Sequence, residues 1–141
     1  MKREIKFRGI SDDSKEFIYG GISIISNYEE AYIIEVDNSY PSTRRVLSNS
    51  VGQFTGLKDK NGVDIYEGDV LRNINHYEDG NPYYNYHTVV WRDRFSGWFC
   101  LNKQDKTKTE RDGSCQLWVY LAATNCEVLG NIHENKDLIN Q

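Results

Sequence analysis

Apolar and polar residues alternate along this chain in short runs that predict β-strands. In Glu4–Arg8 the alternation has a period of two and places Ile5 and Phe7 on one face, as in a half-buried strand. Further β-rich runs bounded by turn residues occupy 17–25, 30–36, 70–74, 86–92, 98–101, 116–121 and 127–132. Helical patterns are fewer: a short helix at 122–125 and a helical turn within 133–140. The pattern predicts a mainly β fold.

Turn residues divide these strands. Asn61-Gly62 favours the left-handed backbone of a tight hairpin, and Glu67–Asp69 forms a second turn that leads into the next strand. The stretch 75–85, with Asp79–Pro82 inside it, predicts a long loop. The polar stretch 102–114 predicts a hairpin with a mobile tip.

Composition narrows the class of protein. A chain of 141 residues fits a single domain, 1–141, and its ten Tyr and three Trp suit pleated sheets. A net charge of -4 disfavours general nucleic-acid binding. No run is long and apolar enough for a membrane helix, and three widely spaced cysteines suit reduced thiols, so we expect a cytoplasmic protein without a membrane partner.

Four segments carry a family resemblance: Ile5–Arg8, Val51–Gly62, Ile65–Val70 and Glu127–Asn135. Their order and spacing resemble the YopX-like family over nearly the whole chain, with 14–48 matching least. The resemblance implies a phage or prophage protein with a small β barrel of the Src-homology-3 kind, extended by hairpin and loop insertions. It implies no chemistry, because the molecular function of that family is not established.

Two groups of residues contain side chains of the kinds that bind metal ions. Asp64, Glu67 and Asp69 are carboxylates within six residues, but on one strand Asp64 faces away from the other two, and the Gly68 turn separates them further. Zinc ligand types occur at Cys100, Cys115, Cys126 and His133. They lack the close pairing of structural zinc sites. We therefore expect no metal, no cofactor and no catalytic residues, and a chain that is not an enzyme.

Two surfaces remain as candidates for binding. The segment 76–87 is rich in Tyr and Asn, the composition of protein-recognition surfaces; its candidate interface residues are Tyr77, Tyr83, Tyr84 and Tyr86. The alternative is that these rings pack back onto the fold. A candidate nucleic-acid face consists of Arg92, Arg94, Lys103, Lys106, Lys108 and Arg111. Interleaved acidic residues dilute the charge of that face.

The sequence thus predicts a non-enzymatic phage or prophage accessory protein in the cytoplasm of a bacterial host. Its leading role is protein binding or self-assembly, with a homo-oligomer or a phage or host protein as partner. A nucleic-acid-binding β barrel is the alternative function, and a metal-dependent enzyme is the weakest one. The identity of the partner depends on surface geometry, which sequence alone does not supply.

Overall fold

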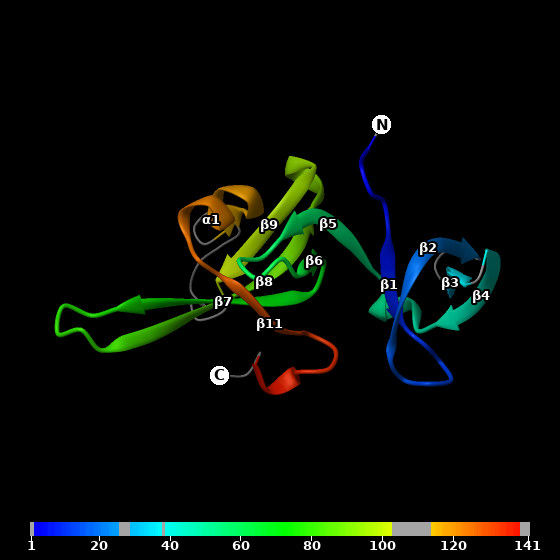
Figure 1. The fold of residues 1–141 in the computed structure, drawn as a ribbon, viewed down its shortest axis with the longest axis horizontal. Helices are drawn as coiled ribbons and strands as arrows, with labels where there is room; N and C mark the ends of the chain where they lie inside the picture. The colour runs from blue at the N-terminus through cyan, green and yellow to red at the C-terminus, as the bar shows by residue number, and fades with distance from the viewer. Residues whose placement is uncertain (1, 26–28, 38, 103–113, 139–141) are drawn as a thin grey trace. The chain divides into compact units, whose positions relative to one another are not determined.

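The computed structural model describes residues 2–25, 29–37, 39–102 and 114–138 (Figure 1). The chain folds as two compact units, unit 1 (Met1–Gly56) and unit 2 (Leu57–Gln141). Antiparallel strands dominate both units, which confirms the mainly β prediction. The single domain over 1–141 stays a prediction.

Unit 1 is a meander of antiparallel strands in the spatial order β4-β3-β2-β1-β5. The elements are β1 (Phe7–Ile10), β2 (Phe17–Ile25), β3 (Glu30–Asp37), β4 (Tyr40–Val46), the 3-10 turn η1 (Ser48–Ser50) and β5 (Gly52–Lys58), which continues into unit 2. The first strand was predicted at Glu4–Arg8 and begins three residues later, at Phe7.

The core of unit 1 consists of the buried residues Ile18, Ala31, Ile33 and Val46. Ala31 and Ile33 are two residues apart on β3, so the alternation of a strand turns both side chains inward. A Cβ on Gly20 of β2 would lie 2.1 Å from the carbonyl oxygen of Ile34. Glycine is required there because the two backbones approach each other too closely for any side chain.

The sheet of unit 1 curls but does not close. One isolated bridge joins Ser11 to Val46, at the end of β4, and Leu47 N donates to the carbonyl oxygen of Ile10 at 2.9 Å. A closed barrel needs a continuous ladder of such pairs, and neither sheet in the described residues has one. The barrel of the Src-homology-3 kind is therefore not confirmed.

Unit 2 is built on a second antiparallel sheet in the order β10-β9-β8-β7-β11. Its elements are β6 (Asp64–Tyr66), β7 (Asp69–His76), β8 (Pro82–Arg92), the 3-10 turn η2 (Asp93–Phe95), β9 (Gly97–Asn102), β10 (Ser114–Gln116), α1 (Leu117–Ala123), β11 (Glu127–Asn131) and the 3-10 turn η3 (Lys136–Leu138). The turn η3 provides the helical turn expected near the C-terminus.

Two local predictions in unit 2 were wrong. The expected loop at 75–85 is mostly strand, because β7 and β8 continue toward each other and leave a turn at 77–81. The expected strand at 116–121 is mainly the helix α1, which places Leu117 and Tyr120 on one side at a spacing of three residues. Both side chains are buried in the core of unit 2 with Ile65, Leu71, Val89, Cys100 and Cys126.

No helix in the described ranges is long and apolar enough to cross a membrane.

Candidate functional site

The predicted tyrosine segment forms the outer part of the β7–β8 hairpin, residues 73–86, which we call the arm. The strand β11 pairs with β7 only as far as Arg72, and β9 pairs with β8 only from His87 onward. Beyond these points, within the part of the chain that the structure describes, β7 and β8 pair only with each other. Figure 1 shows this hairpin extending past the other strands of its sheet.

The turn at the end of the arm is closed by hydrogen bonds. Tyr77 N donates to the carbonyl oxygen of Asn81 at 2.9 Å, and Gly80 N donates to that of Tyr77 at 2.9 Å. The Asp79 carboxylate accepts bonds from the backbone and side-chain nitrogens of Asn81, both at 2.9 Å. Gly80 has a φ of 84°, a conformation that glycine adopts without strain. The arm is therefore an ordered ribbon with a defined tip.

One face of the arm carries Tyr84 and Tyr86. The strand register places Tyr86 opposite Arg72 and Tyr84 opposite Ile74, so these four side chains share a face. The Arg72 guanidinium lies 5.0 Å from the centre of the Tyr84 ring. Tyr84 and Ile74 are 41% and 44% exposed. This face presents an aromatic ring, an aliphatic side chain and a cation to solvent.

Arg72 is held in place at the base of that face by Glu127 of β11. Its Nε donates to Glu127 Oε1 at 3.2 Å and its Nη2 to the same oxygen at 2.5 Å. The hydrogen bond lowers the pKa of Glu127 below its ordinary value and raises that of Arg72 above its own. Because both groups stay charged, the guanidinium remains fixed beneath the Tyr84 ring.

The opposite face of the arm carries Tyr83, whose ring centre lies 4.5 Å from that of Tyr77. Tyr77 is 59% exposed, whereas Tyr83 and Tyr86 are half-buried. The arrangement divides the four predicted tyrosines: Tyr84 and Tyr86 lie together, and Tyr83 and Tyr77 form a separate pair. Both of these groups remain at the surface of the arm.

The base of this second face is anchored to α1. The His87 ring centre lies 4.4 Å from that of Tyr120, and the Tyr120 hydroxyl donates to Asn73 Oδ1 at 2.5 Å. Burial lowers the pKa of His87 to about 4 and raises that of Tyr120 above its ordinary value. Both groups are neutral at pH 7, as their partly apolar surroundings require.

The predicted nucleic-acid face is assembled only in part. Arg92 ends β8 and Arg94 lies in η2, where its guanidinium is 5.6 Å from the centre of the exposed Phe95 ring. Asp93 lies between the two arginines and accepts a bond from Trp91 Nε1 at 2.9 Å. The other residues of this prediction lie outside the described residues: Lys103, Lys106, Lys108 and Arg111. A continuous basic surface is thus not formed by the described part.

The candidate metal carboxylates have separate structural partners. Asp64 forms an ion pair with Lys58 across the β5–β6 hairpin, and Asp69 Oδ2 accepts a bond from Tyr66 N at 2.8 Å. No group of three or more His, Cys, Asp or Glu among the described residues could hold a metal ion. Asp64 is thus paired with a lysine, and Asp69 shapes the turn that leads into β7.

The three cysteines of unit 2 are free thiols: Cys100 in β9, Cys115 in β10 and Cys126 just before β11. Cys100 and Cys126 are buried, and the Cys100 thiol donates to the carbonyl oxygen of Cys115 at 3.5 Å. Burial raises the pKa of Cys100 to about 12 and also raises that of Cys126. These two thiols are therefore protonated at neutral pH, which is opposite to the activation that a nucleophilic cysteine needs.

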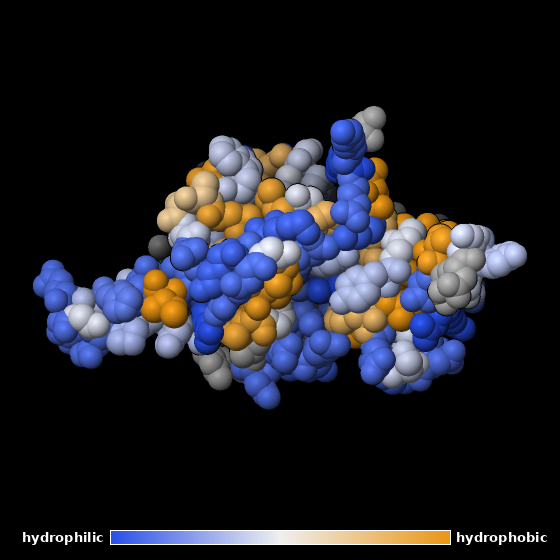
Figure 2. Space-filling view, viewed as in Figure 1, coloured by the Kyte–Doolittle hydropathy of each residue, from blue (hydrophilic) through white to orange (hydrophobic). Residues whose placement is uncertain are grey.

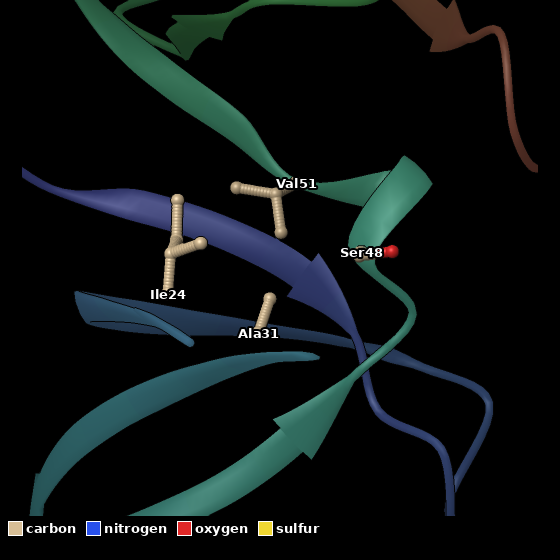
Figure 3. Close-up of a pocket in the computed structure, with 4 residues that line it drawn as sticks. All are labelled: Ile24, Ala31, Ser48 and Val51. Carbon is tan, nitrogen blue, oxygen red and sulfur yellow. The ribbon is translucent and has the colours of Figure 1, made fainter. Parts of the chain in front are cut away.

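Unit 1 contains an apolar pocket of about 190 Å³ lined by Ile24, Ala31, Ser48 and Val51. Figure 3 shows the Ile24, Ala31 and Val51 side chains around the same space, with the Ser48 hydroxyl directed away from them. Its described lining is apolar apart from Ser48.

The central sequence block has a structural role in unit 2. Asp59 Oδ1 accepts bonds from Asn61 N at 2.8 Å and Val63 N at 2.9 Å, which shapes the turn at Asn61-Gly62. Its Oδ2 accepts a bond from Val128 N of β11 at 2.9 Å. One buried carboxylate therefore joins segments that are 69 residues apart in sequence.

Gly68 and Asn131 make a second junction of this kind. Gly68 N donates to the carbonyl oxygen of Val89, and its own carbonyl accepts from Ile132 N, both at 2.9 Å. Asn131 Oδ1 accepts bonds from His133 N and from the next backbone nitrogen, both at 2.9 Å. The residues that carry the sequence resemblance in unit 2 thus form the framework that supports the arm.

Sequence reasoning missed Arg72 and Ile74, the partners of the tyrosines. The signal that could have found them is the alternation continuing through both sides of the turn at 77–81.

The protein is thus a mainly β chain whose turns are shaped by carboxylates and glycines. The chain belongs to the YopX protein family, whose family model matches residues 6–140. Among solved structures it is similar to protein EF1440 from Enterococcus faecalis, with 24% sequence identity, a TM-score of 0.56, and coverage of 96% of this chain and 98% of that one. No curated protein matches the chain.

Proposed function

We propose that this chain is a non-enzymatic binding or assembly module, and that the arm is the part that contacts a protein partner. The observation that carries the proposal is the arm itself: an ordered two-stranded ribbon that presents tyrosines on both faces. In keeping with the family resemblance, we place this activity among phage or prophage accessory functions in the cytoplasm of a bacterial host.

The side chains of the arm support protein recognition. Tyrosine combines a large rigid surface with a polar hydroxyl and loses little conformational entropy when it is covered, which is why it is common in binding surfaces. Figure 2 shows mainly pale and blue atoms over the arm, with an orange group among them. Such a mixture suits a surface that is soluble when free and covered when bound.

The position of the arm also supports this role. Its base is fixed by the Arg72–Glu127 pair on one face and by the contacts of Tyr120 with His87 and Asn73 on the other. A binding element presented in one conformation loses less entropy on association than a free loop does. Both anchors lie in unit 2, so the orientation of the arm within that unit is set by its own sheet and helix.

The proposal is tested with the double variant Tyr83→Ser/Tyr84→Ser. Native purification followed by light scattering should show that the variant loses a specific partner or drops in mass while its thermal unfolding stays close to wild type. Tyr40→Ser is the matched control, because Tyr40 is 79% exposed and lies in β4 of unit 1. Unchanged mass and unchanged partners in the arm variant would contradict the proposal.

The same purification addresses nucleic-acid binding. If the alternative function is correct, the peak should carry excess absorbance at 260 nm that high salt removes. Arg92→Ala/Arg94→Ala should then reduce it, while the arm variant leaves it unchanged.

A further inference from the structure

We propose that the partner of the arm is a second copy of this chain, which pairs with the outer edge of β8 through residues 82–86. This inference rests on the proposed function, because it names the partner of the same arm. Two arms would join edge to edge into one four-stranded antiparallel ribbon.

The outer part of the arm is a sheet of only two strands in the described residues. A two-stranded ribbon is at best marginally stable alone in water, and three or more strands are usual. In the described residues, Pro82–Tyr86 pair only with the β7 side of the ribbon. Every second residue along their other edge presents its N–H and C=O groups outward. These groups are the donors and acceptors that an added strand uses.

The edge lacks the usual protection against pairing. Natural edge strands are blocked by charges, by proline or by short length. The sequence Pro82-Tyr83-Tyr84-Asn85-Tyr86 contains no charged side chain, and its proline stands at the end. Three of its five residues are tyrosines, which favour strands.

The other sheet edges in the described residues are protected. The edge strand β4 carries Pro41, Arg44 and Arg45, and its last residues already bond to the segment after β1. The edge strands β6 and β10 have three residues each, and β11 has five with a register shift between Val128 and Gly130. Among the edges of the described strands, the contrast favours the arm as the one that pairs.

Self-pairing fits the sequence of this edge. Antiparallel pairing of two identical strands has a two-fold axis, so the contact closes at two copies. Centred on Tyr84, the pairing sets Tyr84 opposite Tyr84 of the second copy and Tyr83 opposite its Asn85. Aromatic pairs directly opposite each other stabilise antiparallel sheets, and no like charges meet. The other open edge, Asn73–His76, has two asparagines and a histidine, which favour strands less.

The test is the mass in solution over a range of concentrations, by light scattering or sedimentation equilibrium. Wild type should reach twice 16.4 kDa in a concentration-dependent manner. Tyr84→Lys places two lysines opposite each other at the axis and should raise the dissociation constant roughly 30-fold or more. Tyr40→Lys is the matched control: Tyr40 is an exposed tyrosine on the edge strand β4 of unit 1, outside the arm. It should stay within about threefold of wild type.

A charge-exchange experiment completes the design. Tyr84→Glu mixed with Tyr84→Lys should recover the dimer mass, because the two opposite residues then attract each other. Hydrogen exchange of wild type keeps the proposal testable if a variant does not fold: amides in 83–86 should gain protection with concentration, and those in 73–76 should not.

A monomeric wild type, equal effects of Tyr84→Lys and Tyr40→Lys, or a mixture that stays monomeric would overturn self-pairing. If the wild type is monomeric while Tyr83→Ser/Tyr84→Ser still loses a different protein, this inference fails and the proposed function stands.

Discussion

Replacing Asp59 by asparagine tests the junction that joins the β5–β6 turn to β11. The Asp59 side chain is 8% exposed and accepts three backbone hydrogen bonds, from Asn61, Val63 and Val128. An asparagine amide has one oxygen, so its NH₂ group must face a backbone N–H where the second carboxylate oxygen was. One buried donor then lacks an acceptor, which costs about 1–3 kcal/mol, and the bonds that remain lose the charge that strengthens them.

These losses together predict that the free energy of unfolding falls by about 3 kcal/mol. For a unit of this size the midpoint temperature should drop by roughly 10–20 °C. Tryptophan fluorescence is the assay, since the tryptophans are all in unit 2: Trp91, Trp98 and Trp118.

Asp79→Asn is the matched control, because Asp79 bonds the backbone nitrogen two residues later just as Asp59 does, but at an exposed turn. Asparagine keeps that bond, and its effect should stay within about 0.5 kcal/mol. Equal shifts for Asp59→Asn and Asp79→Asn would refute the reasoning that this carboxylate is a junction.

Three further predictions concern packing and pH. Gly20→Ala should destabilise unit 1 by about 3 kcal/mol or more, because its Cβ meets a carbonyl oxygen. Gly21→Ala should change the stability by less than about 1 kcal/mol. Amide hydrogen exchange in β2 and β3 distinguishes the two variants. Tyr120→Phe should cost about 1–2 kcal/mol in denaturant unfolding by leaving Asn73 Oδ1 without its donor, and an unchanged midpoint would contradict this. Burial lowers the pKa of His87 to about 4 from an ordinary value of 6.5. The free energy of unfolding should therefore keep the full contribution of neutral His87 above pH 6.5 and fall by about 2 kcal/mol as the pH drops toward 4. His87→Gln should remove that part of the pH dependence, and identical profiles for the variant and wild type would contradict this.

Turn chemistry was the part of the fold that the sequence predicted best. Asn61-Gly62 forms the expected reversal, because the positive φ of 79° at Gly62 is a local property of glycine. Gly68 follows the same rule, with a φ of 88°. The additional role of Asp59 in binding β11 was not predictable, because it depends on a contact with a segment far away in sequence.

The errors have tertiary causes. The segment 75–85 contains Asn, Asp, Gly and Pro, which favour loops one by one, yet pairing between β7 and β8 extends the strands up to the turn at 77–81. The helix α1, Leu117–Ala123, has no charged residue and contains β-favouring side chains, so its local sequence favours a strand. Burial of Leu117 and Tyr120 against the sheet decides in favour of the helix.

The candidate site was predictable in composition but not in geometry. The sequence indicated four tyrosines in one segment, and the structure assigns Tyr84 and Tyr86 to one face and Tyr83 to the other. That division depends on the strand register, in which a shift of one residue reverses every side chain. It also determines that Arg72 lies beneath Tyr84, a contact between residues twelve positions apart.

The most direct test of the arm as the binding element is site-specific photo-cross-linking in cells. A photoreactive amino acid would replace Tyr84 in one variant and Tyr40, which is exposed in unit 1, in another. We predict one defined protein adduct from position 84, identified by mass spectrometry as a second copy of this chain, and none from position 40. No adduct at position 84, or the same adduct from both positions, would contradict it.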